Sequence, residues 1–70
     1  MSRYRTECDE FEGAEVVKST RDAVCVRVPG VEEEVWLPRS TLGEANECET
    51  EGDVGLLVVQ ARMARQKGLS

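Results

Sequence analysis

The chain has 70 residues, of which 40% are hydrophobic and 33% are charged, and its formal net charge is −5. A chain of this length forms one small domain, which buries only about 60% of the surface that its unfolded form exposes. No apolar stretch approaches the roughly 20 residues of a transmembrane helix, and the N-terminus has no hydrophobic signal region. We therefore expect a cytoplasmic protein without a membrane partner.

The first part of the chain predicts a loose segment followed by a hairpin. Residues 1–10 are polar and are expected to be flexible, so that the folded domain covers residues 11–70. Two strands are predicted near residues 14–19 and 23–28, and in the second of these the valines at alternate positions share one face. A proline and a glycine at residues 29–30 then predict a type II turn.

A third strand is predicted over residues 33–38, ending at Pro38, which has no N–H to donate. Its alternation places Val35 and Leu37 on one face and Trp36 on the other. The indole is the largest apolar side chain of the protein, so we expect Trp36 to be covered in the core. If it were exposed, it would be a natural interface anchor.

The remainder predicts a polar loop, a fourth strand and a helix. The loop covers residues 39–52, with one helical turn near residues 40–44, and the apolar run of residues 55–60 suits a central strand covered on both faces. Residues 61–69 predict a short helix that ends in a Schellman motif. The expected fold is mainly β with a short C-terminal helix, as a small, partly open SH3-like barrel of about four strands.

The residue types do not favour a zinc site or reactive thiols. The chain has no histidine and no CxxC pair, so zinc lacks its usual ligands. Cys25 lies in a valine run and is expected to pack as a small apolar side chain. Cys8 and Cys48 lie among carboxylates, which disfavour the thiolate, and a disulfide between them is not expected in a reducing compartment.

The stretch ECETEGD, residues 47–53, has acids at alternate positions that resemble the start of a calcium loop. The twelfth position of such a loop would be Val58, which cannot ligate an ion and lies in the predicted fourth strand. We therefore expect no metal and no cofactor. Ser40 and Thr41 have no histidine to activate them, and the acids of so short a chain are mostly solvated, so we expect no enzyme activity.

Thirteen of the 14 acids fall in three segments, residues 7–15, 32–34 and 44–53, whereas residues 54–70 contain three bases and no acid. If residues 47–53 were extended, their four acids would face one way, about 6.6 to 6.8 Å apart. Together with the other two segments they would form a contiguous negative face that favours basic partners. A solvated surface that only keeps the protein soluble is the alternative. The candidate partner-binding residues are Glu32, Glu33, Glu34, Trp36, Glu47, Glu49, Glu51 and Asp53.

Three motifs occur in order between Asp22 and Leu69: E-x-W-hydrophobic-P-[KR]-S, then G-D-x-G-x-L-x-V, then a helix that ends in K-G-L. With them the chain resembles a group of small uncharacterised phage and mobile-element proteins. The residues that carry the resemblance are Trp36, Pro38, Arg39, Ser40, Gly52, Asp53, Gly55, Leu57, Val59, Ala64, Gly68 and Leu69. The chain departs from the group at Arg62, where the group tends to carry an aromatic residue. The resemblance implies a phage or mobile-element origin and no particular reaction.

Small acidic phage proteins include anti-CRISPR inhibitors, several of which mimic DNA, and this analogy of class shapes the expected function. We expect a non-catalytic inhibitor or interaction protein whose acidic surface occupies a basic nucleic-acid-binding site on a host protein, such as a CRISPR effector subunit. The alternative is a small barrel accessory protein that binds single-stranded nucleic acid through its basic ends, at residues 3–5 and 62–67. A homodimer is compatible with so small a core, but no residue specifies one.

Overall fold

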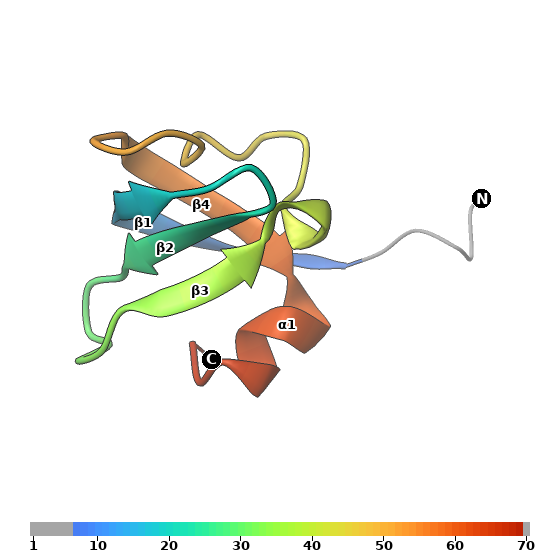
Figure 1. Cartoon of the computed structure of the whole chain (residues 1–70). Helices are drawn as coiled ribbons and strands as arrows, with labels where there is room; N and C mark the ends of the chain where they lie inside the picture. Colours follow the sequence, from blue (N-terminus) through green and yellow to red (C-terminus); the bar gives the residue numbers. More distant parts are fainter. Residues whose placement is uncertain (1–6, 70) are drawn as a thin grey trace.

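The computed structural model describes residues 7–69 as a curled antiparallel sheet with a short helix below it (Figure 1). The elements in chain order are β1 (Cys8–Ser19), β2 (Ala23–Arg27), β3 (Val35–Pro38), the 3-10 helix η1 (Arg39–Thr41), β4 (Val54–Gln60) and α1 (Ala61–Gln66). This confirms the mainly β fold with four strands and a C-terminal helix. No helix among residues 7–69 has the length and apolar character needed to cross a membrane.

The strand order is β3-β2-β1-β4, and the sheet is open. β4 pairs with β1 only, so the prediction of a central fourth strand is wrong. A single bridge between Leu42 and Val59 connects the segment after η1 to the outer edge of β4. The sheet therefore curls towards a barrel without closing into one.

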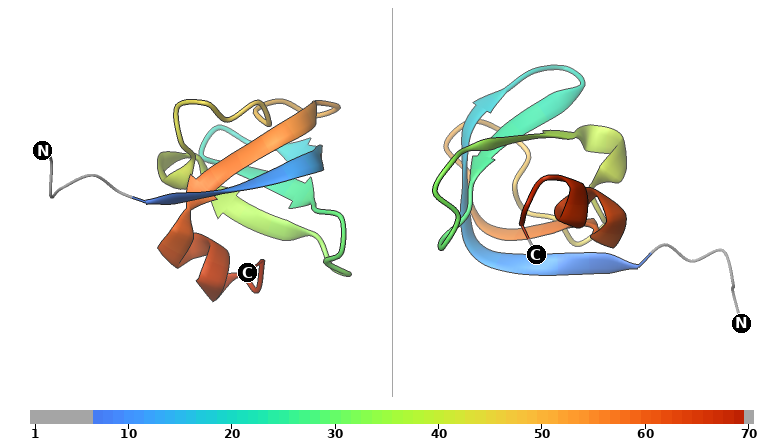
Figure 2. Two further views of the ribbon diagram at one scale, coloured as in Figure 1. Left: turned by 180° about the vertical axis from the view of Figure 1, so that it is seen from behind. Right: turned by 90° about the horizontal axis from the view of Figure 1, so that it is seen from below.

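β1 is long enough to pair with β4 along its first half and with β2 along its second half. It begins at Cys8, so residues 8–10, expected to be loose, belong to the sheet; residues 1–6 lie outside the described residues. Its register shifts between Phe11 and Ala14 and again between Val16 and Lys18. Such bulges bend a strand, and Figure 2 shows the sheet curling around α1.

The core lies on the inner face of the curl. The face assignments of β3 are confirmed, because Leu37 is fully buried and Val35 packs against the core. The other buried members come from β1, β2 and β4, from the segments after β2 and before β4, and from α1 and the turn that follows it: Ala14, Val16, Val24, Val26, Val28, Cys48, Leu57, Val59, Ala64 and Leu69. The prediction of a covered Trp36 is wrong, since this residue is 43% exposed on the opposite face.

Two local predictions about chain turns are confirmed. Val31 N–H donates to Val28 O at 3.0 Å, and Gly30 has φ +88°, as a type II turn requires. At the end of α1, Leu69 N–H donates to Ala64 O at 2.8 Å, which is the long hydrogen bond of a Schellman motif. The motif directs Leu69 back into the core.

Candidate interaction site

Residues 43–47 cover the outer edge of β4. Gly43 N–H donates to Val58 O at 2.8 Å, and Glu47 N–H donates to Leu56 O at 2.8 Å. Two side chains complete the pattern, because Val58 N–H donates to Asn46 Oδ1 at 3.1 Å and Leu56 N–H donates to Glu47 Oε1 at 2.8 Å. The loop thus takes the place of a neighbouring strand, and an apolar strand is tolerated at the edge of the sheet.

Asn46 and Cys48 hold this loop on the core. Asn46 is 7% exposed, and its Nδ2 donates to Cys48 O at 2.8 Å. The Cys48 thiol is fully buried and donates to Ala14 O at 3.6 Å. Burial raises the pKa of Cys48, and the Asp53 carboxylate raises it further. The thiol is therefore a structural group, and the three cysteines form no disulfide.

The stretch at residues 47–53 is not extended, so the condition for four acids facing one way is not met. Asp53 N–H donates to Thr50 O at 2.9 Å and closes a turn. Asp53 Oδ2 accepts hydrogen bonds from Thr50 N–H at 2.9 Å, from Glu49 N–H at 3.1 Å and from Thr50 Oγ1 at 3.1 Å. These bonds from Thr50 and Glu49 lower the pKa of Asp53. Asp53 therefore stabilises the turn.

Exposed acids remain on both sides of β4. Glu7 and the N-terminal half of β1 lie along one edge of the strand, while the loop is bonded to the other edge. We define the acidic strip as the exposed carboxylates of these two segments: Glu7, Glu10, Glu12, Glu44, Glu47, Glu49 and Glu51. Neither residues 7–17 nor residues 40–61 contain a lysine or an arginine. Among residues 7–69, no ion pair joins a member of the strip to a base.

The third acidic segment lies apart from the strip. Glu32, Glu33 and Glu34 are exposed in the connection between β2 and β3, and β3 is at the opposite end of the strand order from β4. The Arg27 guanidinium pairs with Glu34 at 3.0 Å and with Glu15 at 3.5 Å. The contiguous negative face predicted from all three segments is therefore divided into two regions.

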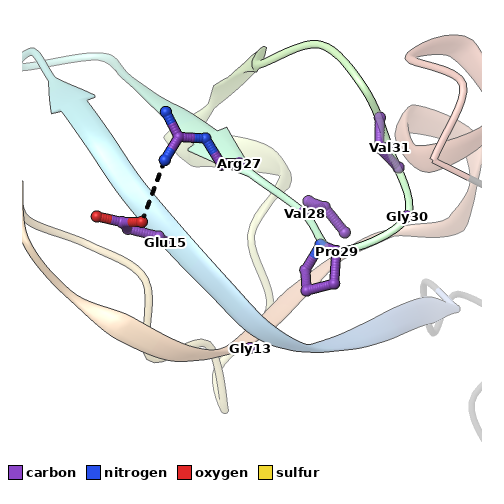
Figure 3. Close-up of a pocket in the computed structure, with 7 residues that line it drawn as sticks. All are labelled: Gly13, Glu15, Arg27, Val28, Pro29, Gly30 and Val31. Atoms are coloured by element: carbon purple, nitrogen blue, oxygen red, sulfur yellow. Dashed lines mark hydrogen bonds and ion pairs between the residues drawn. The ribbon is translucent and has the colours of Figure 1, made fainter.

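An open pocket of about 270 Å³ lies between the bulge of β1 and the turn after β2 (Figure 3). Its polar wall is the Glu15–Arg27 pair, and its apolar wall is the turn at residues 28–31. The lining offers no nucleophile and no second carboxylate for acid–base chemistry. No group of three or more acids or cysteines within residues 7–69 is placed to hold a metal ion.

Trp36 lies on the outer face of the sheet, directly opposite Cys25 of β2. Cys25 is 3% exposed, which confirms that it is buried, although it is outside the main core cluster. Burial raises the pKa of this thiol, and the nearby Glu34 carboxylate, 3.9 Å from Sγ, raises it further. Of the predicted site residues, Trp36 and Glu34 are thus neighbours of one thiol, while Glu47, Glu49, Glu51 and Asp53 lie in the loop beside β4.

The basic ends of the alternative prediction are described in part. Arg62, Arg65 and Lys67 are exposed on and just after α1, whereas Arg3 and Arg5 lie outside the described residues. Ala61 N–H donates to Glu7 O at 2.9 Å, so the start of β1 lies beside the start of the helix. Glu7, an acid of the strip, is therefore hydrogen-bonded through its main chain to the residue directly before Arg62.

Sequence reasoning missed the roles of Asn46 and Glu47 in covering β4. The only signal was an asparagine directly before the alternating acids, and asparagine is common in any polar loop. Comparisons with protein-family models, with curated proteins and with solved structures give no match.

Proposed function

We propose that this protein is a non-catalytic interaction domain whose acidic strip binds a basic, nucleic-acid-binding surface on another protein. The observation that supports it is the position of the strip: exposed carboxylates from two distant segments flank β4, and neither segment contains a base. Such a surface attracts a channel lined by lysine and arginine and competes there with nucleic acid. The narrowest form of the proposal is a phage-type inhibitor of a CRISPR effector subunit.

Some members of the strip are better placed than others to contact a partner. Glu47 already accepts the Leu56 N–H, whereas the side chains of Glu44, Glu49 and Glu51 make no hydrogen bond or ion pair among residues 7–69. Each exposed ion pair contributes about 0.2–1 kcal/mol. Several such pairs together give binding that is fast and sensitive to salt, because charges are screened over about 8 Å at physiological ionic strength.

The proposal is tested by competition. Purified nucleic-acid-binding proteins of the host are loaded with labelled DNA, and displacement of the DNA by this protein is measured between about 50 and 300 mM salt. We expect displacement that weakens with salt. The double variant Glu49→Lys/Glu51→Lys should weaken it at least tenfold.

The matched control is Glu32→Lys/Glu33→Lys, which changes the charge equally on an exposed loop outside the strip, and we expect a loss below threefold. Equal losses for the two double variants would show that only net charge matters and would refute the role of the strip. Direct tight binding of labelled single- or double-stranded DNA by this protein at about 50 mM salt would favour the nucleic-acid-binding alternative instead.

A further inference from the structure

The two edges of the sheet differ. The edge of β4 is covered by residues 43–47, whereas β3 forms the other edge and pairs with β2 only. An open strand edge presents unpaired N–H and C=O groups to any extended chain that approaches it. The uncovered edge of β3 is therefore the place where such a chain can pair.

The direction of each backbone group in β3 follows from the register. Arg39 N–H donates to Asp22 O at 2.8 Å, and Ala23 is paired with Pro38. Hydrogen-bonded and non-hydrogen-bonded pairs alternate in an antiparallel ladder. The main-chain N–H and C=O of Leu37 therefore point towards β2, and the main-chain groups of Trp36 and Pro38 point away from it, towards the open edge. Pro38 has no N–H, which agrees with this assignment.

Along the outer edge of β3, the main-chain groups are blocked at Pro38 and available at residues 34–36. Thr41 Oγ1 donates to Pro38 O at 2.6 Å. Pro38 has no N–H, and its carbonyl is already bonded, so Pro38 offers an added strand neither a donor nor a free acceptor. Within residues 7–69, no hydrogen bond outside the ladder involves the main chain of Trp36 or Glu34. By the same alternation Glu34, just before β3, also faces outward. The open stretch is therefore residues 34–36.

We propose that an extended segment of another protein adds to β3 at residues 34–36 as a fifth strand. The lysine or arginine side chains of this segment would lie on the outer face of the sheet, where Trp36 is exposed. The Trp36 indole is 43% exposed on the outer face, and Glu32 and Glu33 are exposed just before the open stretch. A cation above an indole and beside carboxylates gains both cation–π and electrostatic attraction. Strand addition supplies affinity through the main chain, and these side chains supply the preference for a basic segment.

A second copy of this chain fits the edge less well. Antiparallel pairing about Trp36 would place Glu34 opposite Pro38 of the other copy, which has no N–H to donate and whose carbonyl is taken by Thr41. The register centred on Val35 would instead pair Glu34 with Trp36 of the other copy, but in either register the two chains each carry a net charge of −5 and repel each other. A basic segment without proline meets neither obstacle.

The test uses two capped peptides of nine residues in which arginine and valine alternate. The second peptide is N-methylated at its central amides, which removes backbone donors and keeps every side chain and charge. The chain has a single tryptophan, so fluorescence titration at about 150 mM salt reports on Trp36 directly. We expect the unmethylated peptide to bind at least tenfold tighter and to shift the emission to the blue. Equal affinities of the two peptides would refute strand addition.

Variants of the protein locate the contact. Glu34→Pro removes the outward N–H and should reduce the difference between the peptides to below threefold, whereas Glu34→Gln retains the N–H and should preserve it. Glu49→Lys/Glu51→Lys should leave the difference unchanged, because the strip is not part of this edge. If instead that strip variant removes the difference, the peptide binds beside β4 and the β3 proposal is wrong. The proposed function does not depend on either result.

Discussion

Removal of the Asn46 side chain should lower the free energy of unfolding strongly, although the side chain is small. It is 7% exposed; its Oδ1 accepts the Val58 N–H at 3.1 Å and its Nδ2 donates to Cys48 O at 2.8 Å. The substitution Asn46→Ala would leave the Val58 N–H and the Cys48 carbonyl without these partners. One group belongs to the edge of β4 and the other to the covering loop, so a single change removes one of the connections between the two.

The magnitude follows from the two hydrogen bonds. A typical hydrogen bond contributes about 0.5–1.5 kcal/mol net, and a buried group left without a partner costs about 1–3 kcal/mol. Water can reach part of the loop once the side chain is removed, so we expect a loss of about 2–4 kcal/mol in the free energy of unfolding. A domain of this length has a total stability of about 4–10 kcal/mol. The substitution should therefore remove about two fifths of it at the middle of both ranges.

The assay is urea unfolding followed by far-UV circular dichroism and by Trp36 fluorescence, with the free energy taken from the linear extrapolation. The control is Glu49→Ala, an exposed position of the same loop, which we expect to change stability by less than about 0.5 kcal/mol. Hydrogen exchange should show faster exchange of the Val58 amide in Asn46→Ala alone. A loss below about 0.5 kcal/mol for Asn46→Ala would show that the loop does not depend on this side chain.

The nearly isosteric substitution Asn46→Asp predicts the direction in which stability changes with pH. The introduced carboxyl keeps an acceptor for Val58, but when ionised it opposes the Cys48 carbonyl in a buried site. Burial of the charge raises the folded-state pKa of that carboxyl above its unfolded value of about 3.9. A raised pKa contributes stability at low pH that is lost as the pH rises. Relative to the wild type, this variant should therefore be least stable at pH 7 and recover as the pH falls towards 4.

Three further predictions concern single residues. Hydrogen bonds from Thr50 lower the pKa of Asp53 below 3.8, so the stability that this carboxylate contributes is present above pH 3.8 and is lost as the pH falls below it. In Asp53→Asn, the midpoint of urea unfolding should therefore fall less steeply as the pH is lowered below 3.8. The same slope as in the wild type would contradict this prediction. Gly68 has φ +77° with no atom within 4 Å of an added Cβ, so Gly68→Ala should cost about 1 kcal/mol in thermal unfolding through backbone strain alone; no loss would argue against the Schellman motif. The buried Cys48 thiol, whose pKa is raised, should react with a thiol reagent only on unfolding, while the exposed Cys8 reacts in the native state, as timed labelling and mass spectrometry would show.

Local chemistry explains which parts of the fold could be predicted. The type II turn at Pro29-Gly30 and the Schellman motif at Gly68-Leu69 depend on residues adjacent in sequence, and both were correct. The strand alternation that separates Leu37 from Trp36 is local as well. It does not say which face is covered, and here α1 packs against β1 and β4 on the inner face, so Trp36 stays exposed.

The missed features depend on contacts between distant segments. Residues 8–10 are polar and read as loose, yet they are fixed by pairing with residues 58–60 of β4. The apolar run of β4 is typical of a central strand, and its edge position is tolerated only because Asn46 and Glu47 cover it. Neither relationship leaves a periodic signal in the sequence. The acids at residues 47–53 are a separate case, because the condition that this stretch is extended fails for a local reason: Asp53 closes a turn onto Thr50.

The loop beside β4 contains polar side chains of two kinds, and the difference bears on function. Asn46, Glu47 and Asp53 bond to main-chain groups and are explained by the fold. Glu44, Glu49 and Glu51 are exposed, and their mutual repulsion can only oppose folding. Their presence is therefore explained by something outside the fold, either a basic partner or solubility. Solubility requires charge without position, so moving two of these acids to another exposed loop would preserve it, whereas a docking strip would lose its partner.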